Sequence, residues 1–373
     1  MKKPYRKGMI RFSPEAATGF CISQNSRGST AYTQAAAAIL YSLKYFLLIF
    51  EKKSVMIVTD YDRFGVFMMK NKKWKGNLIL LLTALIWGVS FIAQSKGVEQ
   101  IPPMTFNGVR SLLGGIVLLP VVYFLDSGKR KKGMSVKPID KTLIEGGIMC
   151  GVFLCVATTL QTAGMIYTSP GKAGFITALY MVIIPIVNLF FGKKPRPIIL
   201  ISVFVAVIGL YLMCIQSSLA LNFGDFLILM CAFVFAGHIL VVDHYSPKVD
   251  GVKLSCIQFF VCGIINVIMA LLFEKPSFAP LCGVWGAIAY SGIMSCGVAY
   301  TLQIVGQKYT DPTSASILMS LESVFATLST VILVALGWNI TGGAMTTREI
   351  LGCILMFIAI ILVQLPEKSR KTS

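Results

Sequence analysis

Glu322 is the residue in this chain best suited to a chemical role, because it is an acid inside an otherwise apolar segment. It lies about ten residues into the segment 313–336, near mid-membrane if that segment crosses a bilayer. A charge at that depth costs roughly 2.5–3.5 kcal/mol on insertion scales, so the side chain should face protein or water. Glu322 could contact the amine of a bound molecule or act as a protonatable group. The alternative is a neutral acid that holds helices together.

Arg110 is the matching cation, about one and a half turns into the segment 104–125. Two interpretations stay open. The side chain could extend to the lipid headgroups of the outer face, or it could bind a substrate carboxylate with two parallel hydrogen bonds.

Other polar and aromatic residues in apolar segments complete the candidate site. Gln161 and Gln303 occupy equivalent positions and need partners, and hydrogen bonds between helices are the favoured alternative to substrate binding. His238 could sense protons, although a buried structural histidine is the commoner case. The predicted substrate-binding residues are Trp87, Ser90, Gln94, Asn107, Arg110, Gln161, Tyr180, His238, Gln303 and Glu322.

The sequence offers no pattern for catalysis, metal binding or a cofactor. His238 and His244 are the only histidines, and no acidic cluster accompanies them. The ten cysteines include no CxxC pair and lie mostly in apolar runs, where cysteine behaves as a small hydrophobic residue. The phosphate-binding GxxxxGK[ST] motif is also absent, so direct ATP drive is not expected.

The composition is that of a protein whose solvent is lipid. Hydrophobic residues make up 55% of the chain and charged residues 13%, and the mean hydropathy is +0.76. A soluble domain carries roughly a quarter of its residues as charges. The net charge of +18 does not indicate nucleic-acid binding, because the basic residues lie in short loops between apolar runs. The lipid bilayer and a small molecule are the expected partners.

Ten apolar segments are long enough to cross the membrane. They span 77–95, 104–125, 143–166, 171–191, 197–215, 224–242, 253–273, 283–306, 313–336 and 349–365. One set of connecting loops and ends holds nineteen lysines and arginines, and the opposite set holds four. Positive residues face the cytoplasm. Both ends of this core, and so both termini, are therefore predicted to be cytoplasmic in a multi-pass protein of the cytoplasmic membrane.

The termini differ from this core. Residues 1–68 are expected to be a disordered extension or a mis-assigned start, with the natural start near Met69 before a short basic tail. A helix at 35–50 is the alternative, although Lys44 interrupts it. Residues 367–373 are expected to form a basic cytoplasmic tail.

The core is duplicated. The sequence LQTAGMIYTSP at 160–170 returns as LQIVGQKYTDP at 302–312, and Arg110 aligns with Gln258. The two copies, 69–216 and 217–366, hold five spans each. Because five is odd, the second copy must enter the membrane inverted, and inverted repeats place a shared cavity near the bilayer centre. The predicted fold is an all-α membrane protein of ten transmembrane helices in two inverted five-helix repeats.

Four segments, taken in order, resemble the EamA branch of the drug/metabolite transporter superfamily. They are WGVSFIA at 87–93, PMTFNGVR at 103–110, the helix junction at 167–180 and SLESVFA at 320–326. The resemblance covers about 77–365. The acidic residue that often ends the fourth and ninth helices of the family is absent, Ser323 replaces a common proline, and 339–347 is an insertion.

The resemblance implies a carrier for small metabolites, often one that exports amino acids or related compounds. With the duplicated core, it predicts a secondary transporter that works by alternating access. A drug or nucleotide-sugar carrier of the same superfamily is the main alternative. A membrane-embedded transferase would need clustered His, Asp and Glu near a membrane surface, and a receptor or scaffold would not need inverted repeats. Whether the carrier forms a homodimer is left open.

Overall fold

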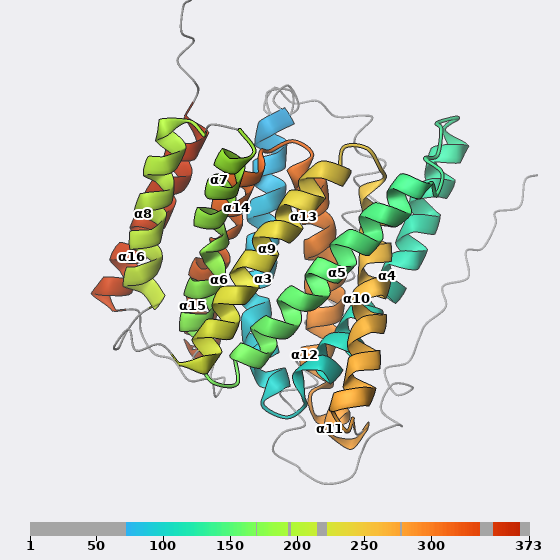
Figure 1. The fold of residues 1–373 in the computed structure, drawn as a ribbon, viewed down its shortest axis with the longest axis horizontal. Helices are drawn as coiled ribbons and strands as arrows, with labels where there is room; N and C mark the ends of the chain where they lie inside the picture. Colours follow the sequence, from blue (N-terminus) through green and yellow to red (C-terminus); the bar gives the residue numbers. More distant parts are fainter. Residues whose placement is uncertain are drawn as a thin grey trace, which may run out of the picture. The chain divides into compact units, whose positions relative to one another are not determined.

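A computed structural model describes residues 72–168, 170–192, 195–214, 222–276, 278–335 and 346–365. All regular structure within these ranges is helical (Figure 1). Four predictions concern residues outside these ranges: the N-terminal extension 1–68, the start near Met69, the alternative helix at 35–50 and the tail 367–373.

The first repeat supplies five of the ten expected spans. A broken helix, α6 followed by α7, accounts for the fourth of them. The helices are α3 (Lys72–Val98), α4 (Pro103–Lys131), α5 (Lys141–Gly164), α6 (Pro170–Ala178), α7 (Tyr180–Phe190) and α8 (Pro197–Cys214).

The second repeat follows the same plan. Its helices are α9 (Phe223–Tyr245), α10 (Gly251–Phe273), α11 (Phe278–Gly283), α12 (Trp285–Ala289), the π-helix η2 (Tyr290–Tyr300), α13 (Thr301–Gln307), α14 (Pro312–Met319), α15 (Glu322–Ala335) and α16 (Thr347–Gln364). Within the described ranges, eight helical spans are long and apolar enough to cross a membrane, and α8 holds a shorter apolar stretch. With α8 and the 18-residue α16, the ten expected spans each coincide with a helix or a run of helices.

The two repeats are inverted, as expected. Thr310, just after α13, donates to Asn77 near the start of α3 at 3.1 Å. Lys308 beside it donates to the carbonyl of Val249, just after α9, at 3.1 Å. The start of α3 and the end of α9 therefore lie at the same end of the bundle, so the first helices of the two repeats run in opposite directions (Figure 1).

Equivalent contacts recur at the two ends of the bundle. Thr168 donates to Asp225 near the start of α9 at 2.7 Å, which repeats the contact of Thr310 with Asn77. Glycine permits close packing beside both contacts. A Cβ on Gly76 would lie 2.8 Å from Tyr309 Cβ, and one on Gly224 would lie 2.6 Å from the carbonyl oxygen of Gly164.

Replacing Gly224 with alanine should therefore lower the free energy of unfolding by about 1–3 kcal/mol, the usual cost of overpacking. The new Cβ would meet backbone of α5, which cannot move aside without shifting the helix. Thermal unfolding of the purified protein in detergent measures the effect. Gly128→Ala is the matched control, because nothing lies within 4 Å of its added Cβ. Equal unfolding temperatures for the two variants would contradict the close approach.

The fourth and ninth spans, expected over 171–191 and 313–336, are present and are each broken near the centre. The breaks fall at Leu179 and at Ser320–Leu321, which are equivalent in the two repeats. Ser316 and Ser320 donate their hydroxyls to carbonyls three residues earlier at 2.8 Å, and the chain tightens there. Such local bonds compete with the regular helix ladder. Discontinuous membrane helices commonly form the substrate site of transporters.

The eighth span, expected over 283–306, is also present but is not a regular α-helix throughout. It contains eleven residues of π-helix, η2, between the short helices α12 and α13. The π-helix packs against α4, where a Cβ on Gly114 would lie 3.0 Å from the carbonyl oxygen of Gly292. π-helical turns often occur at functional sites. The eighth span and the two broken spans are therefore candidates to line such a site.

Candidate functional site

A small cavity lies among the helices of both repeats, beside the two helix breaks. Its volume is about 30 Å³. A water molecule needs roughly 10–15 Å³ of such space, so the cavity has room for about two waters. Its lining residues are Trp87, Phe91, Gln94, Arg110, Gln161, Thr177, Tyr180, Phe235, His238, Ile239, Ser295, Tyr300, Gln303, Met319 and Glu322.

Glu322 and Tyr180 meet at this cavity. Glu322 is the first residue of α15 and Tyr180 the first of α7, so each follows the break in its span. The Tyr180 hydroxyl donates to Glu322 Oε1 at 3.4 Å, and the two side chains are 4% and 5% exposed, respectively. The structure thus brings together two residues that occupy the same position in the two repeats.

Arg110 also faces the cavity, so of the two interpretations left open by the sequence the structure excludes extension to the lipid headgroups. It is 2% exposed, and its Nε donates to Asn107 Oδ1 at 2.9 Å. Its guanidinium carbon lies 5.3 Å from the centre of the Phe106 ring. Among the described residues, Arg110 forms no ion pair. The two terminal guanidinium nitrogens therefore remain able to bind a carboxylate.

Asn107 holds Arg110 in place from outside the cavity. Its side-chain nitrogen donates to Thr162 Oγ1 on α5 at 2.8 Å, which leaves Oδ1 for the guanidinium. Ser90 is likewise buried without lining the cavity, and it accepts a hydrogen bond from Gln94 at 3.4 Å. Asn107 and Ser90 are thus the two predicted site residues that support the cavity wall instead of forming it.

Aromatic rings form one wall. The Trp87 and Tyr300 rings lie 4.6 Å apart between centroids, and the His238 ring lies 6.1 Å from Tyr300. Tyr300 was missed in the sequence. Its spacing offered a signal, because it precedes Gln303 by three residues and so shares a helical face with it. Six other lining residues were also not predicted from the sequence: Phe91, Thr177, Phe235, Ile239, Ser295 and Met319.

Several polar atoms of the cavity residues have no hydrogen-bond partner in the described part of the chain. They are Trp87 Nε1, Gln94 Oε1, His238 Nδ1 and Gln303 Oε1. His238 reaches Gln258 Oε1 through its other ring nitrogen at 3.2 Å. Buried polar groups without partners are costly, so the cavity has unused capacity to bind a polar molecule.

Gln161 and Gln303 differ despite their equivalent positions. Gln161 donates to Thr177 Oγ1 on α6 at 3.2 Å, which is the interhelical bond expected as the alternative to substrate binding. Gln303 keeps its carbonyl oxygen unpaired within the described residues. Of the two amides, Gln303 therefore has the greater freedom to contact a ligand.

A model of the EamA-like transporter family matches residues 74–215 and again 222–365, one match to each repeat. The chain belongs to the EamA-like transporter family. It is accordingly a multi-pass membrane transporter of the drug/metabolite transporter superfamily, as its sequence motifs suggested.

Relatives of this EamA-like transporter occur in archaea and bacteria. An uncharacterized transporter of Archaeoglobus fulgidus is 30% identical over 79% of this chain and 87% of its own length. The uncharacterized inner membrane transporter YedA of Escherichia coli K12 is 22% identical over 75% of this chain and 88% of its own. A solved crystal structure, 19% identical, covers 78% of this chain and 96% of its own with a TM-score of 0.61, which shows a shared fold.

Proposed function

We propose that this EamA-like transporter is a secondary carrier for a small polar metabolite with both a carboxylate and an amine, an amino acid or a related compound. It exports this substrate across the cytoplasmic membrane by alternating access. Arg110 binds the carboxylate and Glu322 binds the amine or carries a coupling proton. The pairing of one buried base and one buried acid in the same cavity is the observation that carries this proposal.

The remaining cavity residues support a polar substrate. Trp87 offers an indole N–H donor, and Gln94 and Gln303 offer amide oxygens, all without protein partners among the described residues. A cavity of about 30 Å³ is too small for an amino acid. The described conformation is therefore one that must widen to load, as expected of a carrier between its open states.

The charge distribution supports a cytoplasmic position for both ends of the core. Five lysines lie at the end of the bundle where α3 begins: Lys129, Lys137, Lys248, Lys253 and Lys308. Positive residues mark the cytoplasmic side. The relative YedA is named an inner membrane transporter, which is consistent with a cytoplasmic-membrane location.

A carrier of cationic drugs is the second candidate. It is favoured by the aromatic wall of Trp87 and Tyr300 next to Glu322, since aromatic faces and an acid attract organic cations. The two candidates differ in their need for Arg110, because a drug cation without a carboxylate gains nothing from a guanidinium.

Reconstitution into proteoliposomes tests both candidates. Liposomes are loaded with a panel of labelled amino acids and related zwitterions, and efflux is measured with and without a pH gradient. A second panel contains organic cations that lack a carboxylate. We expect efflux of at least one zwitterion above that from protein-free liposomes. Transport of the cations alone would reject the metabolite proposal, and failure of both panels would reject this substrate assignment.

A further inference from the structure

Two carboxylates join α4 of the first repeat to α10 of the second, one at each end of this antiparallel helix pair. Glu274 follows the last residue of α10, and Asp126 lies near the end of α4. They are equivalent in the repeats under the same alignment that pairs Arg110 with Gln258. We name the resulting contacts the Glu274 clasp and the Asp126 clasp.

The Glu274 clasp caps the start of α4. Glu274 Oε1 accepts the backbone N–H of Met104 at 2.8 Å, and Oε2 accepts the N–H and the hydroxyl of Thr105 at 2.8 and 2.6 Å. The residue before α4 is Pro102, whose side chain cannot cap the helix. The orphan N–H groups of α4 are therefore satisfied by the opposite repeat.

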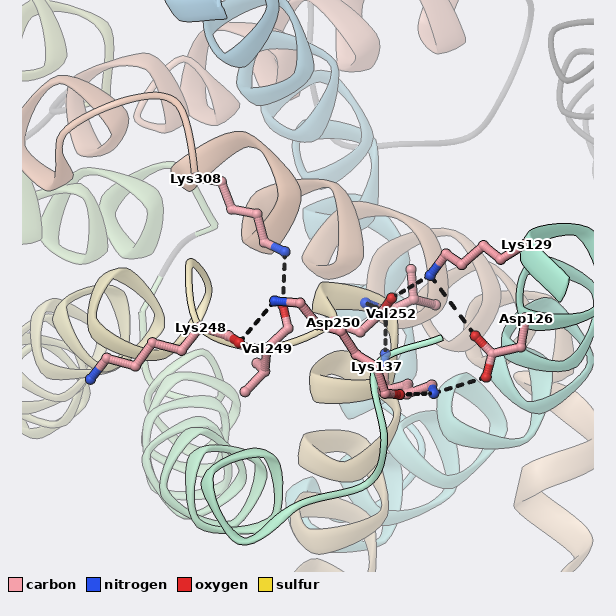
Figure 2. A network of polar contacts seen from close by, with 9 residues as sticks. Asp126, Lys129, Lys137, Lys248, Val249, Asp250, Val252 and Lys308 are labelled. Carbon is pink, nitrogen blue, oxygen red and sulfur yellow. Dashed lines mark hydrogen bonds and ion pairs between the residues drawn. The ribbon is translucent and has the colours of Figure 1, made fainter. Parts of the chain in front are cut away.

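The Asp126 clasp holds the other end of the pair (Figure 2). Asp126 Oδ2 lies 2.8 Å from the ammonium of Lys253, which occupies the position equivalent to Thr105. Lys129 adds a bond to Asp250 at 2.7 Å, and Asp250 caps α10 through the N–H groups of Val252 and Lys253. Burial raises the pKa of Asp250, but its contacts with Lys129 and these N–H groups lower the pKa more, so this carboxylate stays charged at neutral pH.

The chemistry of the two clasps differs while their positions agree. At one end a carboxylate binds backbone N–H groups, and at the other it binds a lysine side chain. Both contacts are closed in the same conformation. Opening the Glu274 clasp would leave the first N–H groups of α4 without partners, and opening the Asp126 clasp would separate a largely buried ion pair. Both losses are costly, which favours keeping each clasp closed during the cycle.

We propose that the Glu274 and Asp126 clasps keep α4 and α10 together at both ends throughout the transport cycle, so that access changes by movement of the other helices around this pair. This inference rests on the proposed function. It also assigns a role to the wall that carries Arg110: because Arg110 lies on α4, its guanidinium keeps one position while the opposite wall moves.

Cross-linking at either end tests the proposal. Cysteines at Thr105 and Glu274 replace the Glu274 clasp with a covalent link, and cysteines at Asp126 and Lys253 do the same at the other end, both in a Cys282→Ser background. We expect each oxidised protein to keep at least about half of the transport rate of its reduced form. Loss of transport on oxidation of either pair, with recovery on reduction, overturns the proposal. Single-cysteine variants treated in parallel control for oxidation elsewhere.

A second measurement needs no substrate, so it separates this proposal from the function above. Spin labels are placed at the equivalent positions Met104 with Leu272, and Phe124 with Val252. Their distance distributions are recorded by pulsed electron resonance in lipid nanodiscs between pH 5 and pH 8. A single narrow distance at both ends is expected under every condition. A second distance at either end would show that a clasp opens, and would overturn the proposal even if the transport panel had failed.

Discussion

Replacing Glu322 with glutamine is expected to reduce transport at least about 30-fold, or to uncouple it from the pH gradient, while the folded protein remains in the membrane. Glutamine keeps the size of the side chain and its contact with Tyr180, but it can neither carry a negative charge nor exchange a proton. Truncating one partner of a buried charge pair typically costs about 2–5 kcal/mol, which is more than a tenfold loss. The loss of transport should therefore be larger than any loss that a lower stability of the folded protein would cause.

Efflux from proteoliposomes measures this prediction, with size-exclusion chromatography and thermal unfolding to confirm folding. Glu145→Gln is the matched control, because Glu145 is exposed on α5 and, among the described residues, its ion-pair partner is Lys141 at 3.5 Å. The control variant should transport at the wild-type rate. Normal, gradient-sensitive transport by Glu322→Gln would remove this acid from the mechanism.

Replacing Arg110 with lysine should weaken the apparent affinity for a carboxylate substrate by about 100-fold, on the same scale for buried charge pairs. Lysine keeps the positive charge but loses the planar fork that binds a carboxylate through two hydrogen bonds. It also loses the bond from Nε to Asn107 that aims the guanidinium at the cavity. The loss should appear mainly as a raised KM.

The substrate itself provides the sharper comparison here. An analogue that lacks the carboxylate should be transported equally by wild type and Arg110→Lys, because the guanidinium has nothing to bind on it. Arg130→Gln, near the exposed end of α4, controls for the loss of a basic side chain. Equal losses for the acid and its decarboxylated analogue would show that Arg110 supports the fold instead of the substrate.

The sequence predicted the architecture well because the architecture depends on long-range periodic features. Apolar runs of membrane-spanning length and the repeated LQ–G–YT–P pattern are visible without coordinates. Tyr180 and Glu322, which contact each other in the structure, occupy equivalent positions in that repeat. The breaks at Leu179 and Ser320 were not predicted. At Ser320 the hydroxyls of Ser316 and Ser320 bond to carbonyls three residues earlier, and at Leu179 the backbone N–H bonds to the carbonyl of Ile176, three residues earlier.

The cavity lining was harder to predict than the fold. The direction of Arg110 depends on Asn107, which is anchored in turn by Thr162 on another helix, and no local spacing reveals such a chain of contacts. Tyr300 ends a π-helix, so the residues before it, such as Ser295, follow a spacing that differs from the α-helical one, whereas Gln303 after it lies in α13. Residues such as Phe235 and Met319 enter the wall only through the packing of both repeats.

The contact between Tyr180 and Glu322 places the pseudo-symmetry axis between these two side chains, since the axis relates each position to the other. Two glutamates at this point would repel each other, and two tyrosines would supply no acid. The two halves share a common plan, yet the residues at the point where they meet differ, so this point holds a single carboxyl group. Under the proposed function, a group on the axis is equally distant from both sides of the membrane, so one carboxyl group serves loading and release alike.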